Sequence, residues 1–216
     1  MKIKEQYQEV KKFFKDRYSD LDTAAEENSR DPYTTLISCI ISQRTKEERT
    51  KQASKRLFSK ADSPEQMDKL SQQEIKESIK PAGMYNQKSK RIKQTTKQIL
   101  EEYNGKVPKS RVELMKLPGV GYKTADVTRC FGFGIETIPV DTHVNRIPKR
   151  LGWVPEDSSK EQVKEKLEEI TPKNERGFFH VALIHFGRDI CLPRKPKCEE
   201  CQFTDFCDYY KENIKK

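Results

Sequence analysis

Helix-start signals recur along this chain, whereas no segment alternates apolar and polar residues around a two-residue turn as a β-hairpin would. Asp31 precedes a proline, which suits the first position of a helix. A capping box, in which Ser or Thr is followed three residues later by Glu, begins at Thr45, Ser71 and Ser110. We therefore predict an all-α fold, with further helix starts at Ser63, near Asn86 and around Ser159, and stops at Asn104-Gly105 and Gly152.

The length of 216 residues allows one large domain or two small lobes, each with a core. No run of 18 apolar residues is present, and the first residues lack the apolar stretch of a secretory signal, so we expect an intracellular protein with no membrane partner. The net charge of +9 favours polyanions such as nucleic acid, and acidic membranes or simple solubility are the competing explanations.

Four cysteines close the chain in the pattern C-x6-C-x2-C-x5-C: Cys191, Cys198, Cys201 and Cys207. This spacing lets four thiolates surround one centre, either a structural zinc or an iron–sulfur cluster. Disulfides rank last, because the chain carries no secretory signal. Only one pair has the tight C-x2-C spacing of a zinc knuckle, which mildly favours the larger cluster.

A glycine-rich turn, Leu117-Pro118-Gly119-Val120-Gly121, joins a short predicted helix at about 110–116 to another that starts near Tyr122. Glycines turn the backbone tightly and leave its N–H groups uncovered, and the helix start adds partial positive charge. The turn therefore predicts an anion site that suits a DNA phosphate, although a plain helix connector has the same pattern.

Two residues after this turn, Lys123 stands in the first turn of the predicted helix. The helix dipole disfavours a cation there, and partial burial would add to this effect, so the amine is a candidate nucleophile. A solvated surface lysine is the ordinary alternative. Asp141 follows an apolar stretch and precedes another predicted helix, where it is expected to cap the helix and present its second oxygen to a neighbouring site.

Three motifs in this order, the segment from Leu117 through Lys123, Val140-Asp141-Thr142-His143 and the four-cysteine tail, closely resemble endonuclease III, a DNA glycosylase family of the helix-hairpin-helix superfamily. The resemblance covers roughly residues 30 to 207. It implies a [4Fe-4S] cluster on the four cysteines. It also implies two helical lobes with an interlobe cleft: a six-helix lobe at 23–132, with the helix-hairpin-helix at about 110–131, and a cluster lobe built from 1–22 and 133–216.

The activity implied by the resemblance is removal of oxidised pyrimidines from duplex DNA, followed by β-elimination at the abasic site. Lys123 would form a Schiff base with the sugar of a flipped nucleotide, and Asp141 would stabilise the developing positive charge or accept the lysine proton. Gln43 and the turn Met84-Tyr85-Asn86 would fill the gap that the extruded base leaves. The expected DNA-binding residues are Gln43, Met84, Tyr85, Asn86, Gly119, Val120, Gly121, Tyr122, His143, Arg194, Lys195 and Lys197.

Arg194, Lys195 and Lys197 lie between the first two cysteines, so the cluster is expected to fix a basic loop against DNA phosphates. Two residues depart from the family pattern: Tyr122 replaces a common basic residue, and Asp126 replaces a common asparagine. Lys123 itself argues against the adenine- or mismatch-removing relatives, which typically lack it.

Three other hypotheses compete with the lyase. The first is a monofunctional or mismatch-directed glycosylase of the same superfamily, the second a non-catalytic helix-hairpin-helix DNA-binding protein, and the third a small electron carrier. The pair Lys123 and Asp141 disfavours the second, and a single cluster on a large basic scaffold disfavours the third. A monomer is expected, because no long heptad pattern is present.

Overall fold

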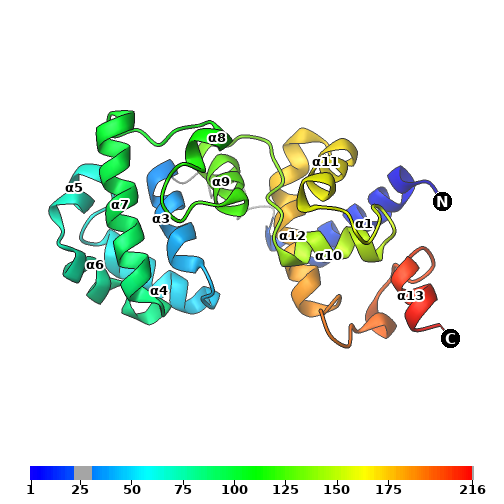
Figure 1. The fold of residues 1–216 in the computed structure, drawn as a ribbon. Helices are drawn as coiled ribbons and strands as arrows, with labels where there is room; N and C mark the ends of the chain where they lie inside the picture. The colour runs from blue at the N-terminus through cyan, green and yellow to red at the C-terminus, as the bar shows by residue number, and fades with distance from the viewer. Residues whose placement is uncertain (22–30, 216) are drawn as a thin grey trace. The chain divides into compact units, whose positions relative to one another are not determined.

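The computed structural model describes residues 1–21 and 31–215, and these ranges are helical with no strand (Figure 1). The all-α prediction is confirmed. Contacts between Cα atoms divide the chain into a terminal unit, Met1–Asn28 with Glu136–Lys216, and a central unit, Ser29–Ile135. The resemblance had suggested 23–132 for the central lobe, and its boundary at residue 23 lies outside the described residues.

The central unit is a set of helices around α7, the longest of them (Figure 1). Its buried core comes from residues such as Leu36, Ile40, Leu57, Ile92 and Ile99, each fully buried. Its elements are α3 (Pro32–Ser42), α4 (Glu47–Phe58), α5 (Pro64–Lys69), α6 (Gln72–Ser78), the 3-10 turn Lys80–Ala82, α7 (Tyr85–Tyr103), α8 (Arg111–Leu114), α9 (Tyr122–Val127) and a π-helical turn, Thr128–Gly132.

Helix α7 starts and stops where the backbone turns left-handed. Met84 precedes it with φ 47°, and Asn104 ends it with φ 52°, next to Gly105 with φ 76°. The predicted start near Asn86 and the predicted stop at Asn104-Gly105 are therefore confirmed.

Most of the predicted helix starts also hold. Asp31 caps α3 by accepting from the Thr34 N–H at 2.9 Å, and Ser63 caps α5. Ser71 and Ser159 each form a complete capping box, at α6 and at α11 (Lys160–Ile170) respectively. The local pattern was sufficient at these four positions.

Two predicted capping boxes are wrong. The hydroxyl of Thr45 does not cap α4, because it contacts Lys88 and Ala82 instead, and Lys46 takes the N-cap position. Ser110 makes no side-chain cap on α8. The carboxylate of Glu113, which the box requires, accepts from the Tyr103 hydroxyl and pairs with Lys116, each at 2.8 Å.

The terminal unit packs aromatic and aliphatic side chains from both ends of the chain into one core. Phe14 from the first helix, Phe179 and Phe186 from α12, and Phe203 from the cysteine segment are all buried in ring-to-ring contact. The helices of this unit are α1 (Ile3–Arg17), α10 (Thr142–Arg150), α11 (Lys160–Ile170), α12 (Arg176–Asp189) and α13 (Asp208–Asn213). Gly152, with φ 75°, follows α10 as predicted.

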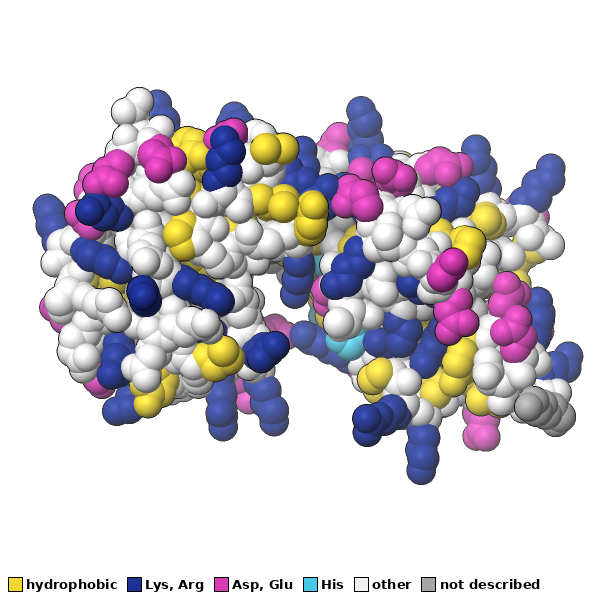
Figure 2. Space-filling model, viewed as in Figure 1, with side chains coloured by type: hydrophobic (Ala, Val, Ile, Leu, Met, Phe, Trp, Pro, Cys, Tyr) yellow, Lys and Arg dark blue, Asp and Glu magenta, His cyan; other side chains and the backbone are white. Residues whose placement is uncertain are grey.

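Lysine and arginine side chains are spread over the visible face of both units (Figure 2). Among the helices of the described chain, none has the length and apolar character needed to cross a bilayer.

Candidate functional site

The glycine-rich turn between α8 and α9 leaves backbone donors open. Gly119 adopts φ +80°, and the Val120 N–H closes the turn on the Leu117 carbonyl at 3.1 Å. Within the described chain, the N–H groups of Gly119 and Gly121 donate to no acceptor, and α9 begins without a side-chain cap. These donors and the helix start are the groups that the predicted anion site requires. The Val120 side chain is buried, and its N–H is already engaged within the turn.

Helix α7 holds this turn in place. The Thr95 hydroxyl donates to the Pro118 carbonyl at 3.0 Å, and the Gln43 amide donates to the Gly119 carbonyl at 2.8 Å. Arg91 in turn donates to the side-chain oxygen of Gln43 at 3.0 Å. The hairpin carbonyls therefore face the protein, and the open N–H groups remain for a ligand.

Lys123 lies in the first turn of α9, and its side chain is exposed. The expectation of partial burial is wrong, because only the next residues, Thr124 to Asp126, turn into the core. The open helix start still supplies partial positive charge beside the amine.

Tyr122 and Asp126, the two residues that depart from the family pattern, both contact Arg111. The guanidinium of Arg111 lies 4.7 Å from the ring centroid of Tyr122 and 3.0 Å from the buried carboxylate of Asp126. Asp126 also pairs with Arg129 at 3.5 Å. Tyr122 is thus held beside the hairpin by a cation–π contact, with its ring largely exposed.

Asp141 caps α10 as predicted. Its Oδ1 accepts from the N–H groups of His143 at 2.8 Å and Val144 at 2.9 Å. Its second oxygen, Oδ2, accepts no hydrogen bond from the described residues. One oxygen therefore fixes the carboxylate, and the other remains open to a ligand.

His143, predicted to contact DNA, is half-buried against Gly187 and lies 3.2 Å from Arg146 through Nδ1. Burial lowers the pKa of His143, while the Asp141 charge acts in the opposite direction. The imidazole is therefore mainly neutral near pH 7 and contributes a hydrogen-bonding group rather than a charge.

The residues expected to fill the DNA gap lie at two places in the central unit, the end of α3 and the start of α7. Gln43 ends α3, half-buried, with its amide engaged as described above. Met84 is 48% exposed and Asn86 is exposed, whereas Tyr85 is half-buried against the core. Of the three, the tip methionine is best placed to enter a base stack.

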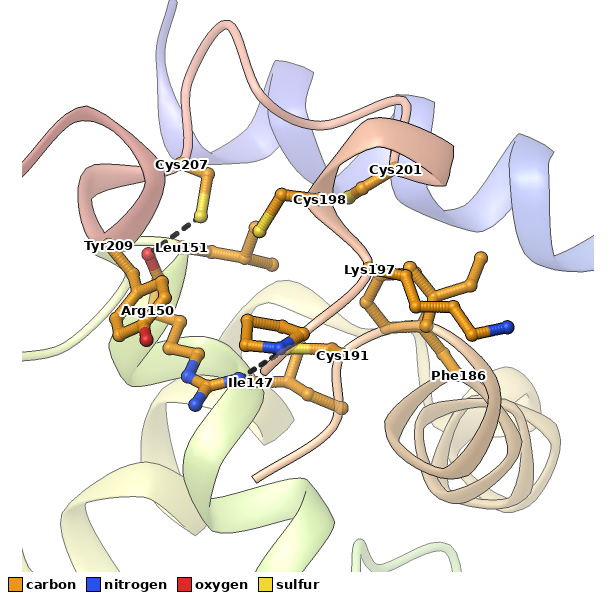
Figure 3. Close-up of a pocket in the computed structure, with 12 residues that line it drawn as sticks. Ile147, Arg150, Leu151, Phe186, Cys191, Lys197, Cys198, Cys201, Cys207 and Tyr209 are labelled. Atoms are coloured by element: carbon orange, nitrogen blue, oxygen red, sulfur yellow. Dashed lines mark hydrogen bonds between the residues drawn. The ribbon is translucent and has the colours of Figure 1, made fainter. Parts of the chain in front are cut away.

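The four cysteines line one pocket of the terminal unit, together with apolar side chains and Arg150 (Figure 3). All four are free thiols. The guanidinium of Arg150 donates to the Cys191 sulfur at 3.3 Å, and Arg146 donates to the Cys191 carbonyl at 2.7 Å. Two arginines beside four sulfurs suit a centre that carries net negative charge.

The thiol chemistry fits a multi-iron cluster. Burial raises the pKa of Cys201 to about 11 and also raises the pKa of Cys198 and Cys207, so the bound metal must itself stabilise the thiolates. No three His, Cys, Asp or Glu side chains of the described ranges are arranged to hold a single metal ion. A [4Fe-4S] cluster would bind one iron to each of the four thiolates.

The basic loop between Cys191 and Cys198 is exposed at Arg194, Lys195 and Lys197. Lys195 adopts φ 49°, and Lys197 pairs with Glu200 at 3.4 Å. Arg150 anchors the loop by donating to the carbonyls of Leu192 at 2.7 Å and Pro193 at 3.0 Å.

Comparison with known proteins bears directly on this arrangement. Residues 37–173 match the HhH-GPD superfamily of base excision DNA repair proteins, and residues 191–207 match the iron-sulfur binding domain of endonuclease III. Endonuclease III of Thermotoga maritima is 42% identical over 86% of each chain. That of Escherichia coli is 38% identical over 87% of this chain and 88% of its own length.

Solved structures agree with these relatives. A trapped endonuclease III–DNA covalent intermediate, an estranged-adenine complex, matches with a TM-score of 0.84 and 33% identity over 98% of this chain and 99% of that one. A thermostable thymine-DNA glycosylase matches with a TM-score of 0.78 and 32% identity over 85% of this chain and 86% of that one.

The helical fold and the family-model match define a base excision repair protein of the HhH-GPD superfamily. Within that superfamily, the chain belongs to the endonuclease III family. It is a DNA glycosylase and abasic-site lyase with a [4Fe-4S] cluster, as the motifs had indicated.

Several residues around the site were missed by the sequence reasoning. From the sequence, Lys88 and Arg91 are only members of a basic segment that either favours nucleic acid or forms a solvated helix face, and Arg150 has no predicted role. Only the tertiary contacts show that these three side chains fasten loops.

Proposed function

We propose that this glycosylase and lyase removes oxidised pyrimidines from duplex DNA, with Lys123 as nucleophile and Asp141 as its carboxylate partner. The observation that carries the proposal is that the Lys123 amine and one carboxylate oxygen of Asp141 are both accessible to a ligand. The amine is exposed directly after a turn with open backbone donors, and Asp141 is fixed through one oxygen while the other is open. The proposal requires that both groups reach the same extruded nucleotide.

The chemistry proceeds through a covalent adduct. The neutral amine of Lys123 attacks the sugar C1′, the C1′–N bond breaks, and the base departs with that electron pair and takes up a proton. The adduct opens to an iminium ion, which acidifies the C2′ proton. Loss of that proton breaks the C3′–O bond and expels the 3′ phosphate, and water then hydrolyses the imine and frees the lysine.

Asp141 acts before the base leaves. Its open oxygen either stabilises the positive charge that develops on the sugar or accepts the proton that the lysine ammonium must lose. Both roles need a carboxylate that does not rotate away, and the two N–H contacts at the start of α10 supply this constraint.

DNA binding combines three surfaces in this proposal. The backbone donors of Gly119 and Gly121 and the start of α9 bind a phosphate, and Tyr122 and His143 contact the DNA beside the reacting nucleotide. Gln43 and the turn from Met84 through Asn86 enter the base stack. The four cysteines ligate the cluster, which holds the basic loop against phosphates and does no redox work in the reaction.

Borohydride trapping tests this proposal. Wild-type protein incubated with an abasic-site duplex or a thymine-glycol duplex is expected to form a covalent complex that is reduced and retained on a denaturing gel. Lys123→Ala is expected to form none, whereas Lys116→Ala, which removes an exposed lysine of the same unit, should trap normally. Equal trapping by Lys123→Ala, or none by wild type, would refute the lysine mechanism.

The lesion itself is tested by single-turnover rates on a panel of duplexes. Faster excision of thymine glycol than of a mismatched thymine or adenine is expected, and the reverse order would point to a mismatch-directed enzyme. We also propose that the protein acts as a monomer inside the cell, where its DNA substrate resides, and gel filtration at micromolar concentration checks the oligomeric state.

A further inference from the structure

Lys88, in the first turn of α7, is a buried cation. Its side chain is 1% exposed, and its ammonium donates to three oxygens: the Ile41 carbonyl at 2.7 Å, the Thr45 hydroxyl at 2.6 Å and the Ala82 carbonyl at 3.1 Å. No carboxylate of the described residues pairs with it. Desolvation lowers the pKa of Lys88 to about 8.

The three acceptors belong to two segments, which we call the Gln43 loop, from Ile41 at the end of α3 through Thr45, and the Met84 loop, from Ala82 through Met84. Ile41 and Thr45 flank Gln43 at the end of α3, and Ala82 lies two residues before Met84. The Thr45 hydroxyl also contacts the Ala82 carbonyl, so the two loops share one polar junction. A pocket lies between the loops, and its lining includes Gln43, Met84 and Lys88.

Both loops contain non-glycine residues in the left-handed region. Arg44 has φ 52° and Met84 has φ 47°, and Gly83 between Ala82 and Met84 has φ 64°. A left-handed backbone is strained for the non-glycine residues Arg44 and Met84, and it persists only where the surroundings fix it. The buried ammonium donates to both loops and is therefore placed to fix them.

Two further side chains on the same face of α7 also hold neighbouring segments. Arg91, one turn after Lys88, donates to Gln43, and Thr95, a turn further on, donates to the Pro118 carbonyl of the hairpin. Residues 88, 91 and 95 follow the i, i+3, i+7 spacing of one helical face. Three DNA-facing segments are therefore fastened to a single helix.

Stability alone is a poor reason for an ammonium at this position. Burying a charge without a counter-ion is costly, and an apolar side chain of similar length would avoid that cost. What an apolar side chain would not supply is a donor to both loops at once.

We propose that Lys88 is a positioning residue for base extrusion, which holds the Gln43 loop and the Met84 loop at the separation needed to fill the gap in the duplex. The inference rests on the proposed function, in which these loops enter the base stack. It makes Lys88 essential for reactions that begin with a stacked, paired nucleotide and dispensable for the chemical step at Lys123.

Single-turnover cleavage of two matched substrates tests this separation. One substrate is an abasic or thymine-glycol site in a duplex, which requires gap filling, and the other is the same abasic oligonucleotide as a single strand. Lys88→Met is expected to cut the duplex about 10- to 100-fold more slowly and the single strand within about twofold of wild type, in the range that misplacement of a site residue costs. Lys97→Met, an exposed lysine on the same helix, is the control and should match wild type on both.

The outcomes are distinct. An unchanged duplex rate in folded Lys88→Met protein, or an equal loss on both substrates, overturns the positioning role. If Lys88→Met does not fold, Thr45→Val, which removes one of the three acceptors, decides the same comparison with an expected duplex loss of about three- to tenfold, the effect of one hydrogen bond. Failure of wild type to trap on either substrate refutes the proposed function instead, and this is measured first.

Discussion

A methyl group added to the hairpin should destabilise the protein at Gly119 but not at Gly121. Gly119 has φ +80°, and a Cβ there would stand 2.7 Å from Cδ of Arg91. Gly121 has φ −103°, and a Cβ there would meet no atom within 4 Å. Gly119→Ala and Gly121→Ala are therefore the same chemical change with different surroundings.

The cost of Gly119→Ala has two parts. The left-handed backbone costs an alanine roughly 1–2 kcal/mol. The methyl group also displaces Arg91, which donates to Gln43, and loss of one such hydrogen bond costs about 1 kcal/mol. Together these terms predict a loss of about 2–3 kcal/mol, or roughly 4–12 °C in Tm for a chain of this size. Gly121→Ala is expected to stay within about 0.5 kcal/mol of wild type.

The substitution that leaves stability unchanged, Gly121→Ala, should nevertheless weaken DNA binding. A phosphate that approaches the Gly121 N–H closely leaves little room for a methyl group, so Gly121→Ala should bind an abasic-site duplex more weakly while its Tm is unchanged. Thermal unfolding followed by circular dichroism and fluorescence-anisotropy binding at fixed salt measure the two effects. Equal melting temperatures for the two variants would refute the steric reasoning, and unchanged affinity in Gly121→Ala would refute the backbone phosphate site.

The remaining predictions concern charge. Asp141→Asn keeps a capping oxygen and should slow base excision about 100-fold or more with little change in Tm, whereas Asp141→Ala should also lose about 1 kcal/mol of stability; both are read by single-turnover kinetics and thermal melts. Replacing Arg194 and Lys195 by alanine should lower the slope of log affinity against log salt by about 2, and intact slopes would exclude these residues as phosphate contacts. The folded pKa of Lys88, about 8 against an ordinary 10.5, means that the unfolded chain binds more protons between these pH values. The free energy of unfolding of wild type should therefore rise, relative to Lys88→Met, on the order of 2 kcal/mol as pH increases through this window, and urea titrations at pH 7.5 and 9.5 check the sign.

The sequence predicted what depends on neighbouring residues. Asp31, Ser71 and Ser159 cap helices because the donors they satisfy lie two or three residues away. Thr45 and Ser110 carry the same signature and fail, because a partner distant in sequence takes the group that the cap needs. Capping boxes are thus reliable only where no tertiary contact competes.

The functional residues also differ in whether neighbouring residues in the sequence reveal them. The four cysteines could be found from spacing, since all the ligands lie within one short segment. Lys123 and Asp141 were individually ordinary, and only the ordered family motifs joined them. Lys88 was out of reach, because its three acceptors come from positions 41, 45 and 82 and no local pattern distinguishes it from the exposed lysines of α7.

The contacts of α7 link the proposed phosphate site to the proposed gap-filling loop. Gln43 donates to the hairpin carbonyl at Gly119 and accepts from Arg91, so the loop that we propose enters the base stack also supports the turn that we propose binds phosphate. Movement of either segment must strain the other through these two hydrogen bonds. Lys88 contacts both sides of the same loop, at Ile41 and Thr45. In the proposed complex, helix α7 would therefore set the distance from the phosphate at the hairpin to the side chains that enter the base stack.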